Sequence, residues 1–368
     1  MSFLAVPAIL SSIGSVAVAI LILLAMVTVH EFGHYVAGKL LKFKINEFSI
    51  GFGPALFKKR NKKTDEIFSL RLFPLGGYCA FDGEENDQES PQSFNRQKPW
   101  KRIVVLFSGA FMNYLLAMVL ILVSFFTFGQ YLYMTYEVEP NETYVGYSFQ
   151  DRDVILECEG RKVYLTSDLV GKLKGKNEGD LVEFTVSRVE EDHREVKTVE
   201  IMLRADTTEL NSASGDILWT AMGIRNDEQD GWGMRITPMR LGFFQTIGRA
   251  FVYSGRLASS ILSALGELVT GKLGISSMGG PITTIQLTSQ IATRDFRSFL
   301  DIASYIGVNL AVFNLLPIPA LDGSKIVFTL IEWIFKKPVN RKVEAIIHTV
   351  GILFLFGFAV LVDLLRFI

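Results

Sequence analysis

The chain has 368 residues and a net charge of −1, with 49% hydrophobic residues, 12% aromatic residues and a mean hydropathy of +0.31. This hydropathy is high for a soluble enzyme and modest for a transporter made of many spans. A few membrane helices joined to at least one polar domain therefore fit best. Neither the charge balance nor any long basic run indicates a nucleic-acid partner, and none is expected.

The first hydrophobic segment is a candidate membrane helix. Residues 1–29 carry no charged side chain, and the apolar part from Pro7 to Val29 is long enough to cross a hydrocarbon core of about 30 Å. The alternative is a cleaved signal peptide, which would need a basic segment before its apolar core, whereas the first Lys or Arg is Lys39. We therefore expect a retained helix within residues 1–42.

The loop that follows, residues 43–101, is expected to be rich in β-structure. Ile45–Phe57 and Ile67–Phe81 contain many β-branched and aromatic residues, and glycines interrupt both runs. This pattern is typical of hairpins broken by glycine. We expect them to lie close to the membrane.

Three further uncharged stretches, each at least about 18 residues long, are candidate membrane helices and bring the expected number of spans to four. They are residues 103–129, 302–321 and 345–362, within the segments 102–130, 299–323 and 324–368. Lys and Arg are concentrated in the loop before the second span and in the loop between the third and fourth. The positive-inside rule then places both loops in the cytoplasm, and both chain ends outside with the segment between the second and third spans.

The outer segment is expected to contain a small α+β domain in residues 131–235. Alternating residues predict strands at Leu181–Val189 and Val196–Leu203, a hairpin that turns at Glu159-Gly160, and a helix from Ser167 to Leu173 capped by Ser167. This pattern indicates a folded polar domain.

Two parts of the outer segment have open interpretations. Residues 206–235, with Trp219 and Trp232, are either an extension of the domain or a degenerate second unit. In the segment 236–298, apolar residues from Leu241 to Thr270 follow helical spacing. They fit either an interfacial amphipathic helix or an ordinary helix packed on the domain.

The clearest chemical motif is His30-Glu31-Phe32-Gly33-His34, at the end of the first span. Only four histidines occur in the chain, and His30 and His34 are spaced so that both imidazoles leave one face of a helix and can converge on one zinc ion. Glu31 places a carboxylate where it could take a proton from water bound to zinc. The motif can occur by chance, but ionisable residues in a membrane span are costly and mark function.

A catalytic zinc needs a third protein ligand, and Asp322 is the strongest candidate. The extension found in metzincins is absent, because Ala37 and Leu40 stand where it requires a glycine and a third histidine. A glutamate ligand, as in thermolysin-like enzymes, could only be Glu47 or Glu84, and both lie in the loop, off any continuing helix. An Asp-Gly pair after a helix is often a simple turn. Here, however, the membrane topology puts Asp322 on the same side as the two histidines, after two prolines that would break the helix.

These motifs together resemble the bacterial, RseP-like subgroup of the site-2 protease family (peptidase family M50). The resemblance is carried by the zinc motif of the first span, by Asn314-Leu315-Leu316-Pro317-Ile318-Pro319-Ala320-Leu321-Asp322-Gly323, and by four short segments. These segments are Ile50-Gly51-Phe52-Gly53-Pro54, Pro74-Leu75-Gly76-Gly77-Tyr78, Ser93-Phe94-Asn95-Arg96 and Met278-Gly279-Gly280-Pro281. It extends over nearly the whole chain. Gly109 and Asn113 match a family motif of the second span, although Ala110 replaces its proline.

The resemblance implies a polytopic α-helical membrane protein of about four spans, with a membrane-associated β-hairpin loop and one extracytoplasmic, PDZ-like α+β domain. It implies that His30, His34 and Asp322 bind one Zn²⁺ per chain and that Glu31 is the general base. Asn309 and Asn314 match positions that hold the unwound backbone of the substrate. His348 is expected to be a packed or interfacial histidine, His193 to be exposed, and Cys79 and Cys158 to be structural.

The expected function is therefore intramembrane zinc endopeptidase activity on single-span membrane proteins, such as anti-sigma factors and signal-peptide remnants, in regulated intramembrane proteolysis. The expected location is the bacterial cytoplasmic membrane, in contact with the lipid bilayer. Two other classes were weighed: an inactive scaffold that binds C-terminal peptides, and a metal transporter. Intact Glu31 and Asp322 argue against the first, and the lack of further intramembrane ligands argues against the second.

Overall fold

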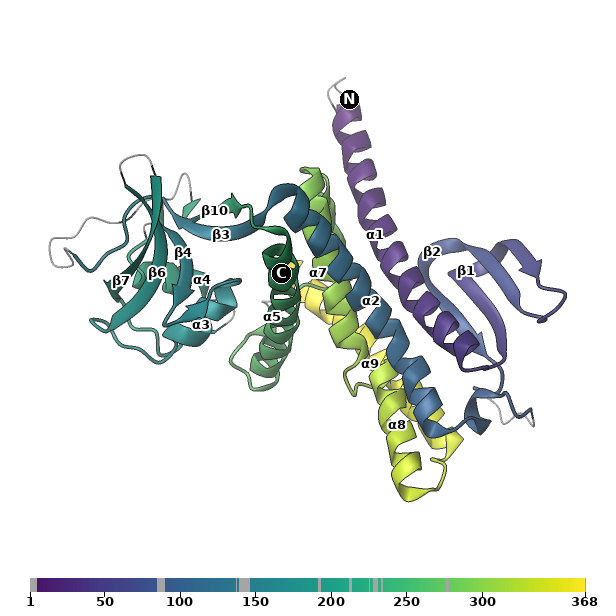
Figure 1. Ribbon diagram of the computed structural model, residues 1–368. Coiled ribbons are helices and arrows are strands. Elements are labelled where there is room, and N and C mark those ends of the chain that lie inside the picture. The colour runs from purple at the N-terminus through teal and green to yellow at the C-terminus, as the bar shows by residue number, and fades with distance from the viewer. Residues whose placement is uncertain are drawn as a thin grey trace. The chain divides into compact units, whose positions relative to one another are not determined.

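The computed structural model describes residues 5–84, 90–136, 138, 146–190, 193–211, 214–224, 226–227, 231–232, 234–275 and 278–367 (Figure 1). The chain forms two compact units. The first comprises residues 1–121 and 278–368, and the second comprises residues 122–277. Each unit is described by itself.

The first unit is built mainly of helices. They are α1 (Ala5–Leu40), α2 (Pro99–Phe128, which continues into the second unit), α6 (Pro281–Ala292), α7 (Phe296–Asn314), α8 (Asp322–Phe335) and α9 (Arg341–Phe367), with a short 3₁₀ turn at Phe94–Arg96. Within the described residues, four helical segments are long and apolar enough to cross a membrane: Ile13–Leu40, Pro99–Phe128, Phe296–Asn314 and Lys342–Leu365. The expected number of spans is confirmed, and the fold is that of a polytopic membrane protein.

The third span differs from its expected position. The uncharged stretch that marked this span reaches Leu321 and contains two prolines that predicted a break in the helix, whereas α7 begins at Phe296 and ends at Asn314, before both prolines. Pro317 and Pro319 cannot continue the hydrogen-bond ladder of a helix, so the chain leaves α7 before them. Asp322 is consequently the first residue of a separate helix, α8, rather than the end of the third span.

Close approach of small residues packs the helices of this unit against one another. A Cβ added to Gly307 on α7 would lie 3.0 Å from the Cβ of Ala117 on α2, and one added to Gly33 on α1 would lie 2.4 Å from the carbonyl oxygen of Ser108. Glycine therefore lets the helix backbones meet, as is common between membrane helices. Buried Ile22, Met26, Ala292, Ala303 and Ile306 fill the space among α1, α6 and α7.

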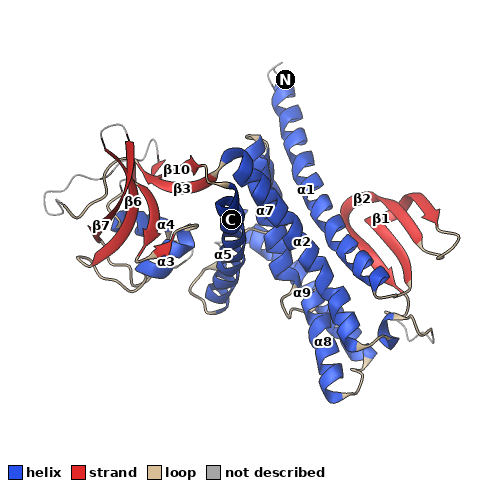
Figure 2. Cartoon of the chain, viewed as in Figure 1, coloured by secondary structure: helices blue, strands red, loops and turns tan. Residues whose placement is uncertain are grey.

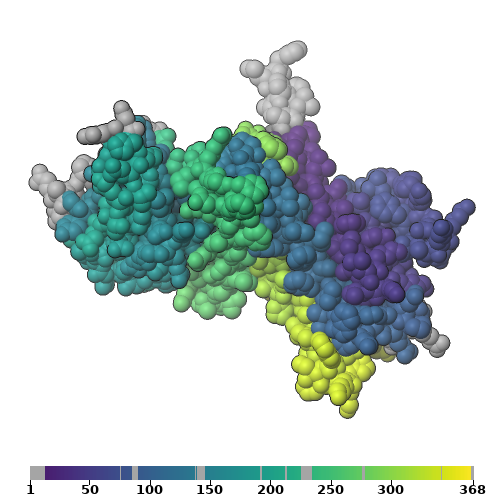
Figure 3. All heavy atoms as spheres, viewed as in Figure 1, coloured from purple at the N-terminus to yellow at the C-terminus, as the bar shows by residue number. Residues whose placement is uncertain are grey.

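The predicted β-rich loop forms one sheet of two long, bent strands, β1 (Ile45–Arg60) and β2 (Ile67–Phe81). The register shows how they bend, because Glu47 is paired with both Ala80 and Ile67, and Ser49 with both Tyr78 and Ser69. Gly51 and Gly53 take positive φ values of 84°, a conformation that glycine adopts easily, and they allow the first bend. Phe43, Ile45, Phe48 and Phe81 share a hydrophobic cluster with Ala37 of α1 and anchor the sheet there. Figure 3 shows the sheet segment beside α1.

The second unit contains a six-stranded sheet in the order β10-β3-β4-β6-β7, with β5 paired to β4 (Figure 2). The strands are β3 (Gln130–Thr135), β4 (Val154–Cys158), β5 (Arg161–Lys162), β6 (Leu181–Glu190), β7 (His193–Met202) and β10 (Met234–Met239), and a separate pair is formed by β8 (Asn226–Asp227) and β9 (Gly231–Trp232). Helices α3 (Thr166–Leu173), α4 (Gly215–Ala221) and α5 (Phe243–Val269) complete the unit. Its core contains Ile155, Leu169, Phe184, Ile201 and Trp219.

Most of the local expectations for this unit are confirmed. The hairpin at Glu159-Gly160 is present as β4 and β5, the two alternating strands are β6 and β7, and the helical pattern near Leu241 is α5. The capping prediction was wrong, because the helix begins one residue earlier and the Asp168 carboxylate accepts hydrogen bonds from the backbone N–H groups of Tyr164 and Leu165. Several residues of 206–235, including the side chain of Trp232, lie outside the described residues.

Candidate metal centre

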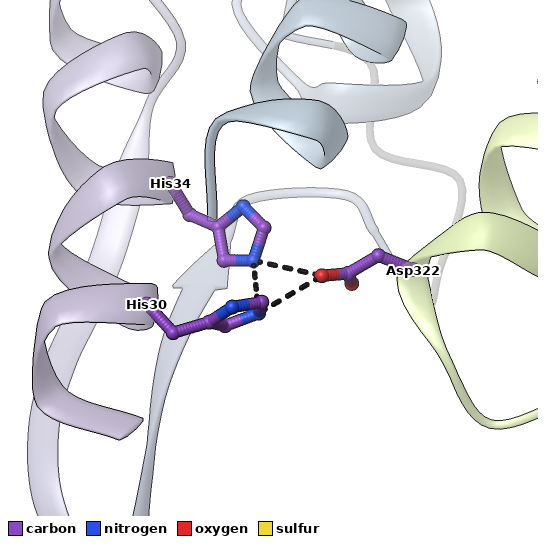
Figure 4. Close-up of side chains that lie close together, drawn as sticks. All are labelled: His30, His34 and Asp322. Atoms are coloured by element: carbon purple, nitrogen blue, oxygen red, sulfur yellow. Dashed lines mark hydrogen bonds and ion pairs between the residues drawn. The ribbon is translucent and has the colours of Figure 1, made fainter. Parts of the chain in front are cut away.

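Three side chains from distant parts of the sequence converge at the end of α1. His30 and His34 project from one face of α1, and Asp322 reaches them from the first turn of α8 (Figure 4). The Asp322 Oδ2 atom lies 2.9 Å from the His30 Nε2 atom and 3.2 Å from the His34 Nε2 atom. The two Nε2 atoms are 3.1 Å apart.

The donor atoms fit a single small cation. Each of the three residues offers one ligand atom, and all three atoms lie within 4.8 Å of one another. Nitrogen and oxygen ligands on a tetrahedral zinc ion, with bonds of about 2.0–2.1 Å, lie roughly 3.3 Å apart, which is close to the observed separations. Within the described residues, no second group of this kind is present.

Both histidines are buried, each only 7% exposed. The His34 Nδ1–H group donates a hydrogen bond of 2.8 Å to the carbonyl oxygen of Val105 on α2. This bond fixes the ring and directs the lone pair of Nε2 toward Asp322, as second-shell partners do for metal-binding histidines. Nδ1 of His30 is hydrogen-bonded to the side-chain amide of Asn314 at the end of α7, with 3.3 Å between the two nitrogens.

The surrounding helices leave space for the imidazoles at Gly109 on α2. A Cβ atom at this position would lie 2.5 Å from the His34 Nε2 atom and 2.7 Å from the His30 Cε1 atom. The neighbouring Ala110 is buried in the helix packing. Gly109 is thus needed because the two rings lie directly against the α2 backbone, a reason that the sequence alone did not give.

The loop that carries Asp322 is held against the end of α7. A Cβ added to Gly323 would lie 2.2 Å from the carbonyl oxygen of Leu316, so only glycine allows the first turn of α8 to come this close. The amide and hydroxyl of Ser324 also donate to the carbonyl of Leu321. These contacts set where the Asp322 carboxylate emerges.

A cavity of about 870 Å³ opens beside this cluster. Glu31, His34 and Asp322 line it, together with Cys79 of β2 and His348 of α9. The Glu31 carboxylate accepts a hydrogen bond from the backbone of Cys79. The predicted general base therefore faces the same cavity as His34 and Asp322.

An ion pair that the sequence did not reveal forms part of the cavity wall. The Lys325 Nζ atom lies 2.7 Å from the Glu84 Oε1 atom, across 241 residues of sequence. The Glu84 carboxylate raises the pKa of Lys325 above its ordinary value. Only the folded chain brings α8 next to the end of the β1–β2 segment, so no sequence pattern could have paired them.

The remaining residues singled out in the sequence are Asn309, His193 and the two cysteines. Asn309 is half-buried on α7. His193 is exposed on β7, and its Nε2 atom lies 3.2 Å from a carboxylate oxygen of Glu195. Cys79 and Cys158 are both buried and free of disulfides, and burial raises the pKa of the Cys158 thiol to about 12. A thiol with such a pKa is unreactive at neutral pH.

The fold and the cluster together define a polytopic membrane protein that carries a candidate metal centre. The family model described as "Peptidase family M50" matches residues 18–358, and the chain belongs to this family, the site-2 proteases. It is a zinc metalloprotease.

Relatives in three organisms carry the name "putative zinc metalloprotease". One from Clostridium perfringens is 32% identical, over 94% of this chain and 96% of its own length. One from Fusobacterium nucleatum is 27% identical over 94% of this chain and 96% of its own length. One from Agrobacterium fabrum is 27% identical over 93% of this chain and 92% of its own length. The similarity extends over nearly the full length of these proteins.

Proposed function

We propose that this protein is an intramembrane endopeptidase in which His30, His34 and Asp322 bind one zinc ion per chain and Glu31 is the general base. The observation that carries the proposal is the meeting, within 4.8 Å, of ligand atoms from two buried histidines of α1 and from the partly buried Asp322 of α8. Two imidazoles and one carboxylate are the donor set of a catalytic zinc site that keeps one position open.

The chemistry follows from the placement of the chain's own groups. Zinc held in this site supplies a Lewis acid that polarises the scissile carbonyl and makes a water molecule acidic enough to attack it. Glu31 follows His30 directly and faces the cavity, so its carboxylate takes the proton of the attacking water and passes it to the leaving amine. The hydrogen bond from Nδ1–H to the Val105 carbonyl holds the His34 ring in place during these steps. The Asn314 side-chain amide would hold the His30 ring when its oxygen faces Nδ1 and accepts from the Nδ1–H group.

We further propose that the substrate is an extended segment of a single-span membrane protein. A peptide bond inside a helix is shielded by its own turn, so cleavage requires that the segment unwinds. Among the described strands, β2 pairs only with β1, so residues 77–81 keep one edge without a strand partner. That edge passes Glu31, where the Cys79 backbone donates to the carboxylate. An unwound segment that adds to this edge would recover its lost hydrogen bonds, and Asn309 and Asn314 are proposed as further contacts for its backbone.

The membrane arrangement is also a proposal. The concentration of Lys and Arg in the loops around β1–β2 and between α8 and α9 supports a cytoplasmic side for the zinc site. The domain of residues 131–235 would then be extracytoplasmic, with the PDZ-like role of excluding substrates whose outer domain has not been removed. The bacterial cytoplasmic membrane is the proposed location, with anti-sigma factors and signal-peptide remnants as substrate classes for regulated intramembrane proteolysis.

Purified full-length protein in detergent tests the proposal. Wild type, Glu31→Gln and Glu344→Gln are compared for zinc content and for cleavage of a panel of single-span segments, where Glu344→Gln removes a different carboxylate from the same cavity. We expect one zinc per chain in all three and cleavage by all but Glu31→Gln. If the protein binds zinc but no segment is cleaved in a way that requires Glu31, the result would favour an inactive scaffold over an endopeptidase.

A further inference from the structure

His348, on the last membrane helix, contacts the loop that delivers Asp322. Its Nδ1 atom accepts a hydrogen bond of 3.1 Å from the backbone N–H group of Ala320, two residues before the carboxylate. The buried Nε2 atom has no hydrogen-bond partner among the described residues. The contact between the imidazole and the loop therefore rests on one hydrogen bond, made by Nδ1.

The residue held by His348 has an unfavourable backbone conformation. Ala320 has a φ of 83°, in the left-handed region that side chains with a Cβ rarely adopt. Such a conformation persists only where the surroundings impose it. The hydrogen bond from its N–H group to His348 is an interaction that fixes this peptide.

The rest of α9 supports the same contact. A Cβ added to Gly351 would lie 2.4 Å from Pro319 Cβ and 2.8 Å from the Pro319 carbonyl oxygen, so α9 lies directly against the residue that precedes Ala320. On its other side, the His348 ring packs edge-on against Phe328 of α8, with 5.8 Å between ring centroids. The imidazole thus bridges α9, the loop and α8.

We propose that His348 is a positioning residue for the metal centre, which acts through Ala320 to set the place of the Asp322 carboxylate. The inference rests on the proposed zinc site and adds a residue from α9 to it. His348 does not ligate the metal, since it is not part of the cluster of ligand atoms. Its role is to hold the strained peptide from which the third ligand extends.

The test measures the zinc dissociation constant of metal-depleted full-length protein in detergent by competition with a chelating dye. The variants are His348→Asn and His348→Leu, which have nearly the same shape. The amide oxygen of asparagine lies close to the position of Nδ1 and can accept from the Ala320 N–H group, whereas leucine cannot. Loss of a second-shell partner typically weakens metal binding about 10- to 100-fold, so we expect this loss for His348→Leu and a change of less than about threefold for His348→Asn.

A second substitution tests the route through Ala320. Glycine takes positive φ values without strain, so Ala320→Gly in the His348→Leu background should recover about fivefold in zinc affinity. Equal losses for His348→Asn and His348→Leu, or no loss for His348→Leu, would overturn the proposal. If His348→Leu cannot be recovered folded, the affinity of His348→Asn decides: a value near wild type supports the proposal, and a tenfold loss overturns it.

The wild type and Asp322→Asn proteins separate this inference from the proposed function. If zinc binding by the wild type does not depend on Asp322, the proposed function itself fails. If binding depends on Asp322 but not on His348, only the positioning role fails.

Discussion

Substitution of Gly109 by alanine probes the space occupied by the two imidazoles. The new methyl group would lie 2.5 Å from the His34 Nε2 atom, where ordinary contact begins near 3.4 Å. Either the ring or the α2 backbone must therefore shift by about 0.9 Å, and the His30 ring is blocked in the same way at 2.7 Å. Displacement of about 1 Å at a catalytic centre can cost on the order of 100-fold in rate.

We expect Gly109→Ala to weaken zinc binding at least about tenfold and to lower the rate of cleavage about 100-fold. Gly357→Ala is the matched control, because Gly357 also lies in a membrane helix and nothing would lie within 4 Å of its added Cβ. Both substitutions raise intrinsic helix propensity by about 1 kcal/mol, so only the steric effect differs. The assay is a zinc titration of metal-depleted protein followed by cleavage of a single-span segment. Wild-type affinity in Gly109→Ala would refute the placement of the rings against α2.

Three further predictions concern groups outside the cluster. The Asp363 carboxylate accepts hydrogen bonds from the backbone of Thr283 and from its hydroxyl at the start of α6, so Asp363→Ala should lower the melting temperature, and Asp363→Asn should lower it less. Lys325→Met leaves the Glu84 carboxylate unpaired in the cavity wall and should lower the free energy of unfolding by about 1–2 kcal/mol after allowance for partial exposure. This loss of stability should disappear in thermal melts of the variant in which both partners are replaced. Burial raises the pKa of Glu47, but hydrogen bonds, including one from Arg71, outweigh it and hold this pKa below its ordinary value of 4.5. The stability that this carboxylate contributes is complete above about pH 4.5 and is lost as the pH falls through the lower folded value. Proteolysis of the β1–β2 segment should therefore accelerate in this window in the wild type but not in Glu47→Gln.

The sequence predicted those features that depend on local pattern. The spacing of His30 and His34 already required one helical face, and long uncharged stretches predicted four spans. Asp322 was reached by a topological argument, since charge placed it on the same side of the membrane as the histidines. The structure brings all three side chains together, and the proposed role of each residue is still to be tested.

What the sequence did not predict depends on contacts between distant segments. The two prolines predicted a break in the third span, but the separate helix α8 and the hydrogen bond between His348 and Ala320 are visible only where the proline-containing loop meets α9. His348 looked like an ordinary packed histidine, because nothing in the sequence of its own helix shows that Ala320, with its left-handed backbone conformation, lies against it. The same holds for Gly109, whose purpose is visible only from the positions of the two rings.

X-ray absorption at the zinc edge of the purified wild-type protein tests the central claim most directly. The account predicts a shell of nitrogen and oxygen ligands at about 2.0–2.1 Å with the scattering pattern of two imidazoles and no sulfur. Cys79 lines the same cavity and offers the competing ligand. A zinc–sulfur distance of about 2.3 Å, or a shell without imidazole, would contradict the assignment of His30, His34 and Asp322.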